Sequence, residues 1–183
     1  MTRDEVLSLM HEYVVNENLR RHMYAVEAAM RTYAGIYNKD EEVWGITGLI
    51  HDFDYEKYPS EAEHSVVGAD ILEEKGYPPE VVHAVRSHVP GSATPRDALL
   101  DKTLFAVDEL CGFIVAVALV RPSKKIEEVK IKSIKKKLKA KGFARQVSRE
   151  HIEQGIEELG VERDEHMQTV LDAMKGISDA IGL

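Results

Sequence analysis

Four histidines and two aspartates have the residue types and the spacing of a metal site. In chain order they are His22, the adjacent pair His51 and Asp52, His64, His88 and Asp108. A single histidine on an apolar helical face is usually a hydrogen-bonded core residue. Four imidazoles and two carboxylates that converge have more acceptor capacity than their mutual hydrogen bonds can use. A cation is then the expected occupant, and imidazole with carboxylate suits Fe, Mn, Zn or Ni.

The elements that must position these residues are helices. Apolar residues recur at helical spacing, and the residues that open helices include a Thr2 to Glu5 capping box, Asn18, Asp40, a Ser60 to Glu63 capping box and Pro79. Later helices are predicted from Arg96 to about Leu119, Ile126 to Lys139, Val147 to Leu159 and Asp164 to Ile181. No hairpin signal or alternating apolar run of useful length appears. The pattern therefore predicts an all-α fold, a single-domain helical bundle over residues 1–183.

Each candidate ligand falls on an inward face or at the end of one of these helices. His22 shares the apolar face of the second helix, and the His51-Asp52 pair stands where the third helix ends. We expect His64 on the helix opened by the second capping box and His88 at the C-terminal end of the next one. Asp108 lies within the long apolar helix, where an unpaired carboxylate is unexpected.

Composition limits the class of protein. The 183 residues are 44% apolar, enough for one core, and the net charge of −8 argues against nucleic-acid binding. The single cysteine, Cys111, excludes a disulfide framework and a cysteine-only zinc site. The chain has no apolar run long enough to span a membrane and no signal-like N-terminus. We expect a soluble cytoplasmic protein with no membrane partner, for which a small phosphorylated ligand remains possible if a local cation site exists; its oligomeric state is not indicated.

Lysines cluster in one segment. Residues 124–141 contain nine lysines and two glutamates. We interpret the run as the solvated outer face of a helix or helical hairpin that packs Ile126, Ile134 and Leu138 inward and lies outside the metal site. A patch for phosphate or for an acidic partner is the alternative.

The ordered ligand set resembles the HD-domain metal-dependent phosphohydrolase superfamily. The flanks are similar too, since Leu49-Ile50-His51-Asp52 closes an apolar helix and Ala106-Val107-Asp108-Glu109-Leu110 fits the terminal aspartate motif. The resemblance covers about Asn18 to Val120. It implies an HD-type bundle with a metal-binding core over residues 18–120 and C-terminal helices, 121–183, packed on that core.

The resemblance also implies roles for the six residues. One metal ion would be bound by His22, His51, Asp52 and Asp108, and Asp52 would bridge to a second ion held by His64 and His88. The catalytic candidates are Asp52, His64 and His88. In the alternative, one ion binds, and His64 and His88 act as general acid or phosphate donors. We favour iron as the cofactor, with manganese, zinc, nickel or cobalt as alternatives.

The implied function is hydrolysis of a nucleotide or another small phosphoester by a metal-activated water. The segment Glu63 to Ala69, with His88, is similar to the branch that hydrolyses bacterial dinucleoside polyphosphates. Candidate substrate contacts are Lys57, Arg21 and Arg121. Asp54, Glu56 and Glu109 are candidates to orient the imidazoles. Two other classes stay open, namely a di-iron oxygenase on the same scaffold and a non-catalytic module that binds a metal or a nucleotide.

Overall fold

Helices account for nearly all regular structure in the computed structural model, which describes residues 1–60 and 62–183. The described residues form ten α-helices, one short 3-10 helix and no strand, so the all-α prediction is confirmed. The helices are α1 (Arg3–Tyr13), α2 (Glu17–Ile36), α3 (Glu41–Ile50), α4 (Val66–Glu74), α5 (Pro79–Ser87), α6 (Leu99–Leu119), η1 (Ile126–Glu128), α7 (Ile131–Leu138), α8 (Arg149–Leu159), α9 (Arg163–Lys175) and α10 (Ser178–Ile181).

Side-chain caps fix where the first three helices begin. The Thr2 capping box opens α1 as expected, and Asp40 caps α3 by accepting hydrogen bonds from the second and third residues of the helix. The second helix begins two residues earlier than predicted. Its cap is Asn16, whose side chain accepts from the backbone N–H groups of Asn18 and Leu19, so Asn18 is already helical.

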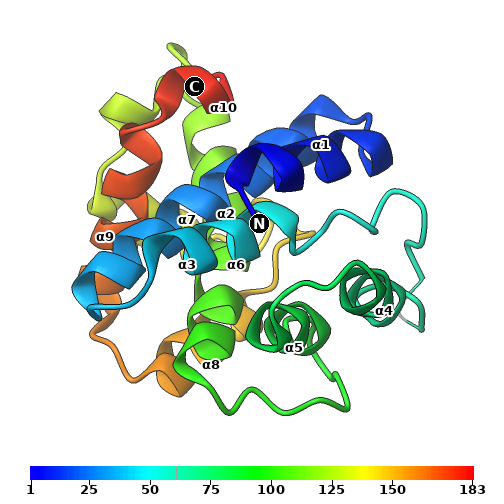
Figure 1. Ribbon diagram of the computed structural model, residues 1–183. Coiled ribbons are helices and arrows are strands. Elements are labelled where there is room, and N and C mark those ends of the chain that lie inside the picture. Colours follow the sequence, from blue (N-terminus) through cyan, green and yellow to red (C-terminus); the bar gives the residue numbers. More distant parts are fainter. Residues whose placement is uncertain (61) are drawn as a thin grey trace.

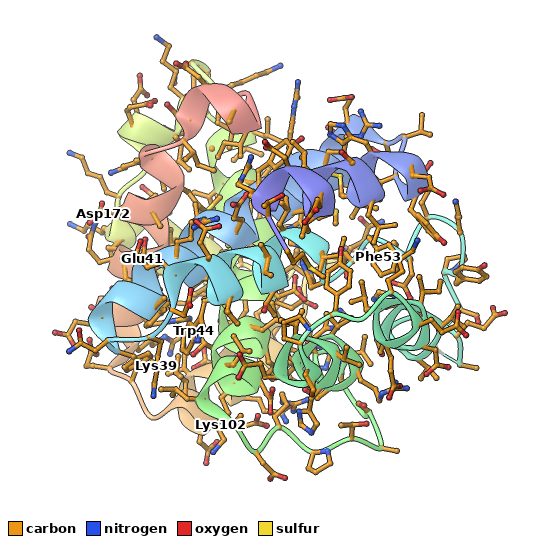
Figure 2. The ribbon with its side chains drawn as sticks, in the orientation of Figure 1. Lys39, Glu41, Trp44, Phe53, Lys102 and Asp172 are labelled. Carbon is orange, nitrogen blue, oxygen red and sulfur yellow. The ribbon has the colours of Figure 1, made fainter. Side chains whose placement is uncertain are left out.

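The helices pack around two apolar clusters. The first, which we call the α6 core, joins α2, α6, α8 and α9, and the second, the α3 core, joins α1, α3, α4 and α5. Figure 1 shows α6 passing behind α3, with α4 and α5 side by side at the right and α9 at the left. Phe53 is fully buried in the α3 core and lies between α1 and α4 in the view of Figure 2. The metal-site candidates lie where the helices of the two cores meet.

The helix expected to carry His64 begins later than the capping box indicated. In the structure α4 starts at Val66, and Ser60 uses its hydroxyl to donate to the Glu63 carboxylate at 2.6 Å instead of accepting from the backbone. Glu61, inside that box, lies outside the described residues. His64 therefore precedes the helix and belongs to a turn, which corrects its expected placement.

The basic segment forms two short elements instead of one helix. Val129 and Lys130 take extended backbone between η1 and α7, and this break lets Ile126, Val129 and Ile134 all be buried. The last expected helix is also divided, into α9 and α10, by Gly176 and Ile177. Within the described residues, no helix combines the length and the apolar character needed to cross a membrane.

Candidate metal centre

The six candidate ligands come from five separate segments and converge on one cleft. His22 is in the second turn of α2, His51 ends α3 with Asp52 directly after it, and His64 precedes α4. His88 ends α5, and Asp108 lies in the middle of α6. Helix ends are useful places for a ligand pair such as His51 and Asp52, because the side chains there need not diverge as they do along a helix.

Four of the residues form one group of ligand atoms. His22 Nε2 lies 2.9 Å from Asp108 Oδ1 and 3.8 Å from Asp52 Oδ2. His51 Nε2 lies 3.4 Å from Asp52 Oδ2 and 3.6 Å from Asp108 Oδ1. Each of the four thus lies within 4 Å of two others. Two triads that share His51, namely His22, His51 and Asp108, and His51, Asp52 and His88, have ligand atoms within 4.8 Å of one another, which is compatible with a bound metal ion.

The other oxygen of Asp52 faces a second pair of imidazoles. Asp52 Oδ1 lies 3.2 Å from His64 Nε2 and 3.2 Å from His88 Nε2. One carboxylate therefore directs its two oxygens to two different groups of nitrogen ligands.

Backbone carbonyls hold two of the imidazoles in position. His51 Nδ1 donates to the Gly48 carbonyl at 2.8 Å, and His88 Nδ1 donates to the Val85 carbonyl at 2.6 Å. Both acceptors lie in the last turn of a helix, where carbonyls lack a helical partner. With Nδ1 as the donor, each Nε2 presents its lone pair to the cluster. His51 Nε2 is buried and has no hydrogen-bond partner, as expected of an atom that needs a cation.

A buried carboxylate orients the third imidazole. Asp54 accepts from His64 Nδ1 at 3.0 Å through one oxygen and from the backbone N–H groups of Ser65 (2.9 Å) and Gly68 (3.0 Å) through the other. Asp54 therefore caps α4 and points His64 Nε2 at Asp52. A Cβ atom at residue 68 would lie 2.7 Å from the Asp54 carboxylate. The close contact between Asp54 and the backbone of α4 therefore requires glycine at this position.

Charges inside the cluster shift the pKa values of its members. Burial alone would lower the pKa of His51, but the carboxylates of Asp52 and Asp108 outweigh burial and raise it well above its ordinary value. Burial would raise the pKa of Asp52, but His51, His64 and His88 hold it well below its ordinary value. The pKa of His64 rises to about 9, because Asp52 and Asp54 outweigh its burial. Burial would also raise the pKa of Asp108, but His51 and His22 hold it below its ordinary value. Asp52 and Asp108 are therefore anions at neutral pH and attract a cation.

The ligand groups open into a cavity of about 300 Å³, which we call the metal pocket. Its wall includes Tyr55, Phe105, Glu109 and Gly112. Burial, together with the charge of Asp108, raises the pKa of Glu109 to about 7. The ring of Tyr55 stands edge-on to His64, with centroids 4.9 Å apart. No lysine or arginine of residues 1–60 or 62–183 lines this cavity.

The three cationic candidates for substrate contact lie elsewhere. Lys57 places its ammonium over the Tyr13 ring, 3.6 Å from the centroid, and Arg121 pairs with Glu128 at 3.2 Å. Neither lines the metal pocket, so the structure gives no support to contacts between these two residues and substrate. Arg21 lines a neighbouring cavity.

The three orienting candidates have different roles. Asp54 contacts His64 as described, and Glu109 lines the metal pocket. Glu56 instead accepts from the backbone N–H groups of Val15 and Asn16 at 2.9 Å and does not touch the cluster. Tyr55 was not among the candidates. Its only signal was its place in the aperiodic segment that follows the His51-Asp52 pair.

Comparison with known proteins identifies the family. The model of the HD domain matches residues 19–118, which include all six candidate ligands. The chain belongs to the HD domain family. Members of this family are mostly metal-dependent phosphohydrolases. The match does not extend to the branch that hydrolyses dinucleoside polyphosphates.

One curated relative is an uncharacterized protein of Methanocaldococcus jannaschii, 32% identical over 92 residues. The aligned region is 50% of this chain and 54% of the relative, so the chain matches about half of that protein's length. No solved structure matches the chain significantly.

Proposed function

We propose that this protein is a metal-dependent phosphohydrolase that acts on a nucleotide or another small phosphoester. The observation that carries the proposal is the position of Asp52, whose two oxygens face two groups of imidazoles in one open cleft. A carboxylate shared in this way suits a pair of metal ions that act on one phosphoryl group.

The proposed roles follow from which atoms face each other. His22, His51 and Asp108 would hold one ion together with Asp52 Oδ2, and His64 and His88 would hold a second ion with Asp52 Oδ1. Bound ions of this kind lower the pKa of a coordinated water to about 7 and stabilise charge on the phosphoryl oxygens. In the overall reaction, the water oxygen bonds to phosphorus, the bond from phosphorus to the leaving oxygen breaks, and that oxygen takes a proton.

The groups around the ligands support this chemistry. Glu109 lies at the wall of the metal pocket, and burial raises the pKa of its carboxyl, so it is placed to exchange a proton with a bound substrate. Tyr55 also lines the cavity, and its side chain carries a hydroxyl that can donate a hydrogen bond. Because the described lining holds no lysine or arginine, metal ions must supply most of the positive charge that a phosphoryl group needs.

The donor set also bears on which metal binds. Imidazoles and carboxylates suit iron, manganese, zinc, nickel or cobalt, and Cys111 is buried and does not belong to the ligand groups. Within this range we propose iron first. The finer assignment, to hydrolysis of dinucleoside polyphosphates, rests only on the likeness of the Glu63 to Ala69 segment and is settled by the substrate test.

The test measures phosphate release by protein loaded with each of these metals. The substrates are nucleoside mono-, di- and triphosphates, a dinucleoside polyphosphate and 4-nitrophenyl phosphate. We expect activity that chelation abolishes and that Asp108→Asn lowers at least about a hundredfold, because the substitution weakens one metal ligand. Asp172→Asn is the matched control, since Asp172 is exposed on α9, away from the cleft.

Two outcomes would contradict the proposal. Oxygen consumption by the iron-loaded protein without phosphate release would indicate the oxygenase alternative. Stoichiometric metal binding with no turnover of any phosphoester would indicate a binding module.

A further inference from the structure

A second cavity adjoins the metal pocket. It has a volume of about 320 Å³, and His22 and Gly112 line both cavities. Its other lining residues are Asn18, Arg21, Val115, Leu119 and residues 181–183. We call it the side pocket.

The two helices that carry His22 and Asp108 continue as walls of the side pocket. On α6, Asp108, Gly112, Val115 and Leu119 follow at intervals of four, three and four residues, which places them on one face. On α2, Asn18 stands one turn before His22. A molecule held by its phosphoryl group in the metal pocket can therefore extend along this face into the side pocket.

Gly112 lies on the wall that the two cavities share. A Cβ atom built on Gly112 meets no other atom within 4 Å, so any side chain at this position would project into free space. Glycine within a helix is less stable than alanine by about 0.5–1 kcal/mol. Contacts with the rest of the protein therefore do not require glycine here. A ligand that extends from one cavity to the other would require it, because a side chain at position 112 would occupy the shared wall.

The chemistry of the side pocket differs from that of the metal pocket. Val115, Leu119 and Ile181 give it an apolar wall, and Leu119 is 49% exposed. Arg21 and Asn18 add a guanidinium and an amide. Arg21 is exposed, and its guanidinium lies so close to Gly182 that a Cβ atom there would meet it at 3.0 Å. Among the described residues, no ion pair involves Arg21. This combination suits a flat, largely apolar group with a hydrogen-bond acceptor or a negative charge at its edge.

We propose that the side pocket binds the leaving group of the substrate, and that Gly112 and Arg21 determine which leaving groups are accepted. The inference rests on the proposed phosphohydrolase function, because it places the phosphoryl group at the metal ligands. The substrate class is then a phosphoester whose leaving group has a flat apolar body and an acceptor edge.

The test compares two substrates that differ in the leaving group. 4-Methylumbelliferyl phosphate has a flat bicyclic leaving group with a carbonyl acceptor, and acetyl phosphate has a leaving group of two carbons. We expect Gly112→Leu to lower the ratio of kcat/KM for the first substrate to that for the second at least tenfold, and Gly112→Ala to lower it less. Gly35→Leu is the matched control, because Gly35 is an exposed helical glycine near the end of α2. An unchanged ratio in Gly112→Leu would overturn the proposal.

A binding measurement separates this proposal from the proposed function. The product 4-methylumbelliferone is titrated into metal-free protein and followed by its fluorescence. We expect binding that Gly112→Leu weakens at least tenfold, that Arg21→Gln weakens severalfold and that Gly35→Leu leaves intact, even if no substrate is hydrolysed. Failure of the metal-free wild-type protein to bind the product, or equal binding by the Gly112→Leu variant, would overturn the side-pocket assignment.

Discussion

Asp54→Asn tests how the protein positions His64 for metal binding. The Asp54 carboxylate accepts from two backbone N–H groups through one oxygen and from His64 Nδ1 through the other. The asparagine side chain of the variant has only one oxygen. That oxygen keeps the hydrogen bonds from the backbone N–H groups of Ser65 and Gly68, so the NH₂ group faces His64 Nδ1. That contact forces Nδ1 to become an acceptor and moves the ring proton to Nε2. A protonated Nε2 has no lone pair to offer a metal ion.

The expected magnitudes follow from the contacts that change. Loss of a partner that orients a metal-binding histidine typically costs 10- to 100-fold in metal affinity, or about 1.4–2.7 kcal/mol. Two hydrogen bonds to α4 change from charged to neutral acceptors, at about 1 kcal/mol each. For a chain of this length, that corresponds to a fall in Tm of about 4–8 °C.

The assay combines metal titration by calorimetry, elemental analysis and thermal unfolding. Glu56→Gln is the matched control, because Glu56 lies in the same segment and also accepts from two backbone N–H groups, but does not touch the cluster. We expect the control to keep wild-type metal affinity. If folded Asp54→Asn protein binds metal as tightly and in the same amount as the control, the proposed role of Asp54 is wrong.

Three further predictions concern the second ion, pH and the lysine run. His88→Ala should lower metal content from about two ions to one and reduce turnover strongly; full metal content with lost turnover would indicate the one-metal alternative. In the metal-free protein, the raised pKa of His64 stabilises the fold fully below its ordinary pKa of 6.5, and this contribution, at most about 3 kcal/mol, is lost as pH rises through about 9. Urea unfolding from pH 6 to 10 measures this loss, and no decline would contradict it. Changing Lys135, Lys136 and Lys137 to Gln should leave turnover nearly unchanged; a loss at low salt that high salt restores would show that the lysines attract substrate.

The sequence predicted the candidate site best where a residue able to bind metal also fell on the apolar face or at the end of a predicted helix. His22 and Asp108 are polar groups on apolar helical faces, and His51 and His88 fall at helix ends, so periodicity placed each of them. Their convergence on one site was implied by the resemblance to the HD-domain family. The all-α fold followed from the same periodicity.

Contacts made by irregular segments could not be predicted in this way. Asp54 caps α4 by accepting hydrogen bonds from the backbone N–H groups of Ser65 and Gly68. This contact requires the segment after Asp52 to turn back toward α4, and no local sequence pattern predicts that turn. Lys57 follows the metal pair in sequence, but the same turn directs its ammonium onto Tyr13. Charge and proximity in sequence did not indicate which way either side chain points.

The ligands also come from both apolar cores. His22 and Asp108 project from α2 and α6, which build the α6 core, whereas His64 and His88 are held at the ends of α4 and α5 in the α3 core. A metal ion bound between these groups works as a cross-link, and its binding energy adds to the cohesion of the two halves as RT ln(1 + [metal]/Kd). At a free metal concentration a hundred times Kd, that is about 2.7 kcal/mol. If the protein binds metal as proposed, the free metal concentration would therefore set part of its thermodynamic stability as well as its activity.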